Sequence, residues 1–451
     1  MAKAKTQYIC QNCGASSMKW VGRCPDCGEW NSYVEEVISA EPARRQGISN
    51  ASTPKTIGQI TSGDRERFDT GIAELNRVLG GGLVKGSLTL ISGDPGIGKS
   101  TLLLQCANNI SMKYGTVLYV SGEESEEQIK IRADRLSAQA EKLYIVSETS
   151  MEIIEEHIRT IKPQFAIIDS IQTVYSDKVN SAPGSVSQVR ECANALMRVG
   201  KTIGIPLFIV AHVTKQGELA GPRVLEHMVD AVLYFEGERT EEIRILRTMK
   251  NRFGTTSEIG VFEMAEEGLI EVYDPSRIFL EDHMDSKEGS VVIGIMEGTR
   301  PILVQVQSLV AETKAVIPRR TSLGIDTPRL NLIIAVLEKK LRIPFYTSDV
   351  YVNVVGGLAV EGTSQDLGLA LSLVSSAKGK EMKHDRILAI GEIGLTGEIR
   401  PVNHVERLVS EGVKMGFETF VIPKRNREKI KQKNLHIIAV DTLKEAVSLL
   451  F

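Results

Sequence analysis

The residues best suited to chemistry form the stretch Gly93-Asp94-Pro95-Gly96-Ile97-Gly98-Lys99-Ser100. Its spacing fits G-x-x-x-x-G-K-S/T, the pattern of a phosphate-binding loop. An alternating apolar run at residues 87–92 precedes it, and a helix-like run follows from Thr101. A strand, a glycine turn and a helix start direct several backbone N–H groups and the positive end of a helix dipole at one anion. The stretch therefore predicts a nucleotide site.

Within this site each polar side chain has an expected task. Lys99 is expected to reach the β- and γ-phosphates, and the Ser100 hydroxyl to hold Mg²⁺. Asp169 ends the apolar strand expected at residues 165–169, and it is placed to hold the Mg²⁺ shell. Capping a following helix is the alternative for Asp169. The residues predicted to bind ATP are Gly93, Asp94, Pro95, Gly96, Ile97, Gly98, Lys99, Ser100, Thr101 and Asp169.

Two adjacent acids, Glu123 and Glu124, follow the strand expected at residues 117–120. A carboxylate there could orient or deprotonate the attacking water, and we favour Glu123 with Glu124 as the alternate. Both could instead be acidic helix-start residues that interact with the dipole. His212 ends the strand expected at residues 206–211, where it is either a γ-phosphate sensor or a structural histidine.

Four of the six cysteines fall within the first thirty residues as Cys-x-x-Cys, ten residues, Cys-x-x-Cys, and a glycine follows each pair. Two such knuckles can supply four thiolates to one tetrahedral Zn²⁺, so zinc is the expected ligand of Cys10, Cys13, Cys24 and Cys27. A redox pair is the alternative. Because so short a segment lacks a core, the metal would supply its folding free energy, about 10–16 kcal/mol. Trp20 and Trp30 are the expected packing residues of this ribbon.

Cations in two glycine-rich stretches, at residues 176–184 and 214–226, are candidates for binding DNA. Both stretches look structureless, and long loops within compact domains are usually functional. Lys178, Lys215 and Arg223 could follow a phosphate backbone there, although solvated surface is the alternative.

Further along, Lys250 and Arg252 flank an asparagine after the strand expected at residues 243–249. In a ring of subunits they could reach the neighbour's nucleotide as trans-acting fingers.

These motifs, taken in order, resemble the RadA (Sms) family of bacterial DNA repair ATPases. The resemblance rests on the cysteine ribbon, the phosphate loop, Ile-Ile-Asp-Ser-Ile-Gln-Thr at residues 167–173 and Lys-Asn-Arg-Phe-Gly at residues 250–254. It covers essentially all 451 residues. The resemblance implies a core similar to RecA and a hexameric ATPase that is stimulated by single-stranded and branched DNA. It also implies branch migration of recombination intermediates alongside RecA.

The last third of the chain resembles the proteolytic domain of Lon proteases. Residues 391–401, Gly-Glu-Ile-Gly-Leu-Thr-Gly-Glu-Ile-Arg-Pro, carry this likeness together with residues 421–423. By the surrounding motifs, Asp366 occupies the position of the serine nucleophile and Glu406 that of the lysine base. Neither can form a Ser–Lys pair, so we expect an inactive protease domain that supports oligomerisation. Residues 424–433 are its most basic stretch, suited either to DNA or to a solvated face.

The predicted architecture is multidomain α/β. It consists of a zinc ribbon at 1–35, a linker at 36–57, a RecA-like ATPase domain with a mostly parallel sheet at 58–275, and a Lon-protease-like α+β domain at 276–451. The formal net charge of −3 excludes a global basic field as evidence for a nucleic-acid partner. No apolar run is long enough for a membrane helix and no signal peptide is recognised, so we expect a cytoplasmic protein.

The sequence thus predicts a DNA-dependent ATPase of recombinational repair that uses ATP, Mg²⁺ and Zn²⁺. Lys99, Glu123, Lys250 and Arg252 are its expected catalytic residues. The expected partners are single-stranded and branched DNA, RecA and five further copies of the chain. Two other readings remain: an ATP-dependent peptidase, and a RecA-like ATPase that acts on protein partners.

Overall fold

The computed structural model describes residues 5–38, 56, 67–212, 224–237, 242–280, 287–432 and 435–451. The chain divides into two compact units, residues 1–272 and 273–451. Lys215, Arg223 and most of the predicted linker lie outside the described residues, as does the side chain of His212. Within the described ranges, no helix has the length and apolar character that crossing a membrane requires.

The first unit begins with a small antiparallel sheet of three strands in the order β2-β1-β3. These strands are β1 (Lys5–Cys10), β2 (Ser16–Ser17) and β3 (Tyr33–Ile38). The following elements are β4 (Arg67–Phe68), α1 (Ala73–Val78), β5 (Leu83–Val84), β6 (Leu88–Gly93), α2 (Lys99–Tyr114), β7 (Val117–Ser121), α3 (Glu126–Arg135), β8 (Leu143–Ser147), α4 (Met151–Ile161), β9 (Phe165–Asp169), α5 (Val186–Ile203), β10 (Leu207–His212), α6 (Val224–Met228), β11 (Ala231–Glu236), β12 (Ile243–Asn251), β13 (Ile259–Ala265) and β14 (Gly268–Glu271).

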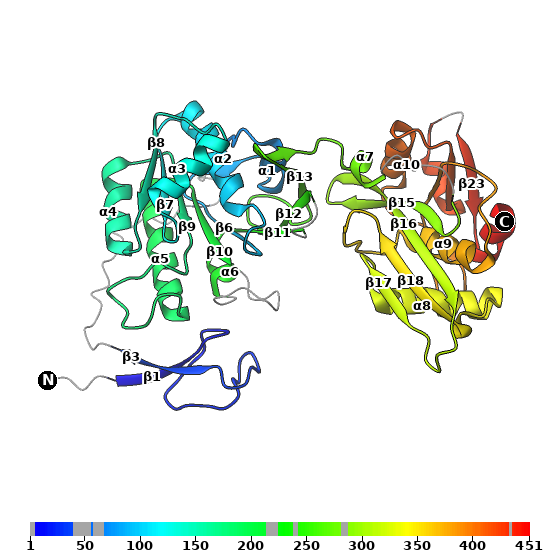
Figure 1. The fold of residues 1–451 in the computed structure, drawn as a ribbon, viewed down its shortest axis with the longest axis horizontal. Helices are drawn as coiled ribbons and strands as arrows, with labels where there is room; N and C mark the ends of the chain where they lie inside the picture. Colours follow the sequence, from blue (N-terminus) through cyan, green and yellow to red (C-terminus); the bar gives the residue numbers. More distant parts are fainter. Residues whose placement is uncertain are drawn as a thin grey trace. The chain divides into compact units, whose positions relative to one another are not determined.

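The main sheet of this unit has nine strands in the order β14-β13-β12-β11-β6-β10-β9-β7-β8 (Figure 1). The strands from β11 to β8 in that order run parallel, whereas β12, β13 and β14 extend the sheet as an antiparallel meander. The predicted mostly parallel sheet is therefore confirmed. Since parallel strands end at the same edge, polar residues that follow β6, β7, β9 and β10 share one side of the molecule.

Successive side chains of the parallel strands point to opposite faces of the sheet, and each face has its own hydrophobic core. Phe165 and Ile167 of β9 join the core beneath α2, whereas Ala166 and Ile168 join the core beneath α4 and α5. Both faces are thus covered by helices, and this explains why the strands read as nearly continuous apolar runs in the sequence.

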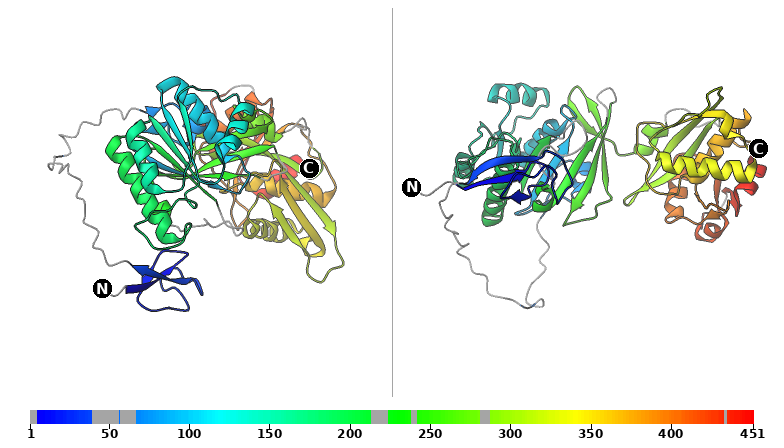
Figure 2. Two further views of the ribbon diagram at one scale, coloured as in Figure 1. Left: turned by 60° about the vertical axis from the view of Figure 1, so that its left-hand side comes forward. Right: turned by 90° about the horizontal axis from the view of Figure 1, so that it is seen from below.

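The second unit contains α7 (Pro275–Leu280), β15 (Ser290–Glu297), β16 (Arg300–Glu312), β17 (Arg320–Leu323), α8 (Thr327–Leu341), a 3₁₀ turn (Phe345–Thr347), β18 (Ser348–Val354), α9 (Asp366–Lys378), β19 (Ile387–Ala389), β20 (Glu392–Ile393), β21 (Ile399–Arg400), α10 (Val405–Lys414), β22 (Thr419–Pro423), a 3₁₀ turn (Lys424–Lys429), β23 (His436–Val440) and α11 (Leu443–Leu450). Its seven-stranded sheet has the order β17-β18-β16-β15-β19-β22-β23. Figure 2 shows α8, in yellow, which packs beside β17 and α9.

Helix α9 is the buried centre of the second unit, because residues from Asp366 to Ser376 are all buried. It packs on β15 and β16 so closely that a Cβ atom at Gly368 would lie 2.2 Å from Cγ2 of Ile293. A glycine is therefore needed where this helix meets the sheet.

Asp366, at the position expected for a protease serine, is fully buried at the start of α9. Its Oδ1 accepts a hydrogen bond of 2.9 Å from Nε of Arg329, its Oδ2 pairs with Nη2 of Arg329, and Oδ2 also accepts from the backbone N–H of Ile393 at 3.0 Å. Burial raises the pKa of Asp366, and the guanidinium opposes this. Glu406 is exposed in the first turn of α10. A salt bridge thus occupies the place where a nucleophile would stand.

Candidate nucleotide site and metal centre

The phosphate loop joins the end of β6 to the start of α2 and contains glycines with positive φ that other residues could not readily adopt. Gly93 has φ 145°, and a Cβ atom there would lie 2.7 Å from the carbonyl oxygen of Phe235. Gly98, which precedes α2, has φ 117°. No side chain caps the helix start and its first turn carries no acid, so the positive end of the dipole remains available to an anion.

The Lys99 ammonium is buried within this loop. Its Nζ donates to the carbonyl oxygens of Gly93 at 2.8 Å and Asp94 at 2.9 Å. Burial lowers the pKa of Lys99 to about 8, and the charges of Asp169, Asp94 and Glu123 partly oppose that shift. The side chain is therefore a cation at pH 7, held where a phosphate would lie against the helix start.

Asp169 lies at the end of β9, and β10 separates β9 from β6, the strand that leads into the phosphate loop. The Tyr119 hydroxyl donates a 2.6 Å hydrogen bond to Oδ2 of Asp169. Burial and the adjacent carboxylate raise the pKa of Tyr119 well above its usual value, so it remains a donor. Tyr119 was not among the predicted site residues, because its contact with Asp169 depends on the pairing of β7 with β9, in which Tyr119 lies opposite Ile167.

Glu123 and Glu124 face different surroundings. Oε1 of Glu123 accepts a 2.5 Å hydrogen bond from the hydroxyl of Ser170, the residue after Asp169, and its charge acts on Lys99. Glu124 instead forms an ion pair with Arg132 of α3. The structure thus brings Lys99, Asp169 and Glu123 to one edge of the sheet and directs Glu124 towards a helix.

Lys250 and Arg252 lie at the opposite edge of the sheet. Lys250 pairs with Val232 at the start of β11, whose neighbour Ala231 pairs with Thr89 of β6. Four residues of strand, about 13 Å, separate Thr89 from Gly93. Nζ of Lys250 donates to the carbonyl oxygens of Glu226 at 2.5 Å and Val229 at 2.9 Å, and Arg252 pairs with Asp230.

The predicted structureless loop at residues 176–184 is in fact anchored, and that expectation was wrong. The buried side chain of Gln188 donates from Nε2 to the carbonyl oxygens of Ser176, Val179 and Ser181, and its Oε1 accepts from the N–H of Ser176. One helix residue therefore fixes the turn and leaves Lys178 exposed at its surface. The amide pattern could not be recognised from loop composition.

The four predicted zinc ligands come together. Their sulfur atoms all lie within 4.8 Å of one another, with 3.7 Å between Cys10 and Cys27 and 3.5 Å between Cys13 and Cys24. A tetrahedron with Zn–S bonds of about 2.3 Å requires sulfur separations of about 3.8 Å. The cysteine set therefore fits Zn²⁺.

The surroundings of the sulfur atoms act in both directions. Burial raises the pKa of Cys13 and of Cys27, whereas backbone N–H groups favour the thiolate at Cys24. Burial raises the pKa of Cys24, but the N–H groups of Cys27 and Asp26 and the Tyr33 hydroxyl outweigh this and lower it to about 6. A thiolate is the form that binds metal.

Trp20 and Trp30 do not form the core of the ribbon, so this expectation was also wrong. They are 53% and 65% exposed, and the buried apolar residues are Cys10, Cys24 and Tyr33. Tyr8, Ala15 and Val21 pack against these buried residues, together with the other two cysteines. A core this small makes the metal the main source of stability.

Three known families match successive parts of the chain, in the order of the predicted domains. A family described as "AAA domain" matches residues 54–218, one described as "Rubredoxin metal binding domain" matches residues 8–35, and one described as "Subunit ChlI of Mg-chelatase" matches residues 331–426. Among solved structures, a KaiC-like protein from Pyrococcus horikoshii OT3 aligns with 46% of this chain and 99% of its own, at 19% identity and a TM-score of 0.39. That likeness is too low to support an inference.

Relatives that align over the full length of the chain share much more of its sequence. The protein named DNA repair protein RadA in Bacillus subtilis (strain 168) is 50% identical over 453 residues, covering 99% of each chain. The protein of the same name in Halalkalibacterium halodurans is 50% identical over 452 residues, again covering 99% of each chain. That of Pseudomonas aeruginosa is 48% identical over 454 residues and covers 100% of both.

Replacement of one zinc ligand tests the metal centre. For Cys27→Ala we expect bound zinc to fall from one atom per chain to less than about a tenth, because a site with three thiolates loses most of the binding free energy. Plasma emission analysis of the purified chain measures this. Asp26→Ala, an exposed neighbour, is the matched control. One zinc atom retained per chain in Cys27→Ala would contradict the assignment.

Proposed function

This chain belongs to the RadA family of DNA repair proteins and carries an AAA/RecA-like ATPase domain, and from that premise we propose that it is a DNA-dependent ATPase that drives branch migration of recombination intermediates. The observation that carries the proposal is the meeting of Lys99, Asp169 and Glu123 at the carboxyl edge of the parallel sheet. This is the edge at which such sheets bind nucleotides.

Each of these side chains has a task in hydrolysis. Lys99 and the backbone N–H groups of the phosphate loop bind the phosphates, and the Lys99 charge opposes the negative charge that develops there. Ser100 and Asp169 would hold Mg²⁺, which when bound neutralises phosphate oxygens. Glu123 orients the attacking water and accepts its proton at Oε1. The Ser170 hydroxyl holds that carboxylate in place.

Lys250 and Arg252 are proposed to act on the nucleotide of a neighbouring copy. Their distance from the phosphate loop of their own chain supports this, since both lie at the amino edge of the sheet. Arg252 is half exposed, as a residue that reaches across an interface must be. A closed ring, which we propose to be a hexamer, gives every nucleotide such a neighbour.

The proposed path from hydrolysis to DNA is short. Residue 176, where the anchored loop begins, lies seven residues after Asp169, and the exposed Lys178 is available to a phosphate backbone. Lys215 and Arg223 are proposed as further contacts of single-stranded and branched DNA, and residues 424–433 as a second basic surface.

We also propose RecA as a partner, on the ground of the family, and a cytoplasmic location.

A peptidase is disfavoured by the buried pair of Asp366 and Arg329, because a carboxylate held by a guanidinium and a backbone N–H cannot attack a peptide. An ATPase that acts only on protein partners remains the second candidate, and DNA stimulation separates it from a DNA motor.

The two adjacent acids can be separated by isosteric variants. We expect Glu123→Gln to lower kcat by roughly 10²- to 10⁴-fold, the usual contribution of a general base, with ATP binding retained. Glu124→Gln is the matched control and should keep turnover, losing only its ion pair with Arg132. Steady-state ATPase assays and binding of a fluorescent ATP analogue measure both. Loss of turnover in Glu124→Gln alone would assign the role to Glu124.

The proposed fingers can be tested by truncation. Arg252→Ala is expected to slow turnover by about 10³-fold or more while ATP binding is preserved, because only transition-state charge loses its partner. Lys250→Ala should slow turnover as well, accompanied by a lower melting temperature because its Nζ bonds one carbonyl group within α6 and one directly after it. Normal turnover in both variants would remove the trans-acting role.

The function itself is tested by ATPase rates with and without single-stranded and branched DNA. We expect stimulation that weakens steeply with salt, since phosphate contacts release counterions. Lys178→Ala should reduce the slope of log affinity against log salt by about one, and Lys142→Ala, an exposed lysine before β8, should leave it unchanged. Equal rates with and without DNA would favour the protein-directed ATPase.

A further inference from the structure

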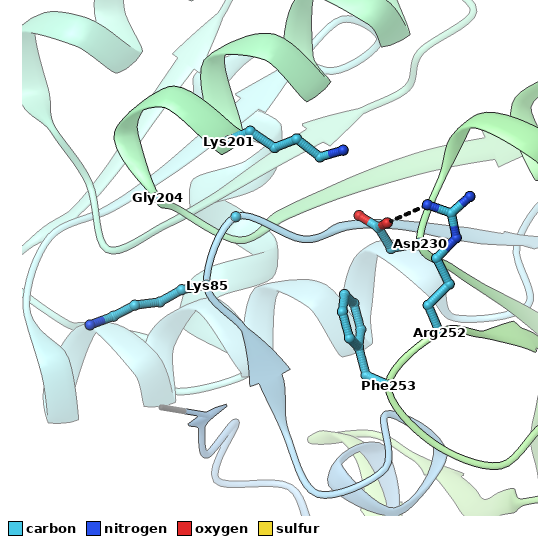
Figure 3. A pocket seen from close by; sticks show the side chains of 7 residues that line it. Lys85, Lys201, Gly204, Asp230, Arg252 and Phe253 are labelled. Carbon is cyan, nitrogen blue, oxygen red and sulfur yellow. Dashed lines mark hydrogen bonds and ion pairs between the residues drawn. The ribbon is translucent and has the colours of Figure 1, made fainter. Parts of the chain in front are cut away.

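A pocket of about 460 Å³ opens at the amino edge of the main sheet, on the side opposite the phosphate loop. It is lined by Lys85, Gly86, Lys201, Gly204, Asp230, Arg252 and Phe253. Figure 3 shows Lys201 reaching towards the side where Arg252 lies, whereas Lys85 extends away from it. Three cations around one carboxylate give the pocket a net positive charge, which suits an anion.

Asp230 stands between this pocket and the strand that carries the phosphate loop. Its backbone N–H donates to the carbonyl oxygen of Leu88 at 2.9 Å, and its Oδ2 accepts from the N–H of Leu88 at 3.1 Å. Leu88 is the first residue of β6, whose last residue is Gly93. Both polar groups at the start of that strand are thus bound by one residue.

The same residue also binds Arg252 twice. Its carbonyl oxygen accepts from the N–H of Arg252 at 3.0 Å, and its Oδ1 lies 3.1 Å from Nη1 of the guanidinium (Figure 3). Asp230 is 6% exposed, whereas the Arg252 side chain is 53% exposed. A buried carboxylate therefore fixes one corner of an exposed guanidinium, which carries five N–H donors in a rigid fork.

We propose that Asp230 is a positioning residue for Arg252 in the hydrolysis of ATP bound to a neighbouring copy of the chain. By binding Nη1, it presents the remaining guanidinium donors to the pocket, where the neighbour's terminal phosphates enter beside Lys201. By binding Leu88, Asp230 links the Arg252 guanidinium to the start of β6. This inference rests on the proposed action of Arg252 across an interface.

The isosteric variant Asp230→Asn separates this role from a structural one. Its amide oxygen can still accept from Leu88, whereas its NH₂ group and lost charge no longer hold the guanidinium. We expect kcat to fall roughly ten- to a hundredfold through misplacement of Arg252, with the KM for ATP and the melting temperature unchanged. Glu155→Gln, which removes the partner of Arg159 on α4, is the matched control and should leave kcat unchanged. Wild-type turnover in Asp230→Asn would overturn the proposal.

Mixed assemblies give the decisive readout. Co-expressed Asp230→Asn and Lys99→Ala chains, purified through two different tags, should hydrolyse ATP faster than either variant alone. The intact phosphate loop of the Asp230→Asn chain then meets a correctly held Arg252 from its Lys99→Ala neighbour. If Asp230→Asn instead damages its own β6, no such gain appears and the proposal fails.

Arg252→Ala mixed with Lys99→Ala separates the two levels of the argument. A gain in this mixture without one in the Asp230→Asn mixture would overturn the role of Asp230 and leave the trans-acting finger intact. A gain in neither mixture would overturn both the finger and its positioning residue.

Discussion

The parallel strands β8, β7, β9, β10, β6 and β11 all end at the same edge of the main sheet, and this shared direction determines where chemistry can occur. Ser121 and Asp169 are register partners at that edge, and Gly93 ends β6 at the same edge, opposite the last residue of β10. The Lys99 ammonium is then surrounded by carbonyl and carboxylate oxygens, and burial alone lowers its pKa. The antiparallel meander that follows β11 returns the chain to the other edge, and it places Lys250 and Arg252 there.

Much of this arrangement could be predicted from the sequence, because the relevant signals are local. The strand at Phe165–Asp169 was expected with the bounds it has, since it is an apolar run that ends in an acid. The phosphate loop and the cysteine tetrad depend on spacing, which the sequence displays directly. The predicted zinc ribbon, mostly parallel core and Lon-like C-terminal domain are confirmed as types of domain.

What the sequence could not provide depends on contacts between distant residues. The different surroundings of the two adjacent glutamates depend on Ser170 and Arg132, which are far from them in the sequence or on another element. The exposure of Trp20 and Trp30 depends on how the ribbon folds, since its buried residues are Cys10, Cys24 and Tyr33. The order of the loop at 176–184 depends on a single amide, that of Gln188. The double attachment of Asp230 joins residues 142 positions apart, beyond any local pattern.

Helix α9 has a consequence for how the chain acquires its structure. An isolated helix of this composition has almost no polar face, so water would not support it. Its cover comes from β15 and β16, which leave the ribosome earlier, and from β19 and α11, which leave later. During synthesis, the side of the helix that β19 and α11 cover therefore stays exposed until those elements have left the ribosome. Until α11 has left the ribosome, the uncovered apolar surface of this helix favours aggregation.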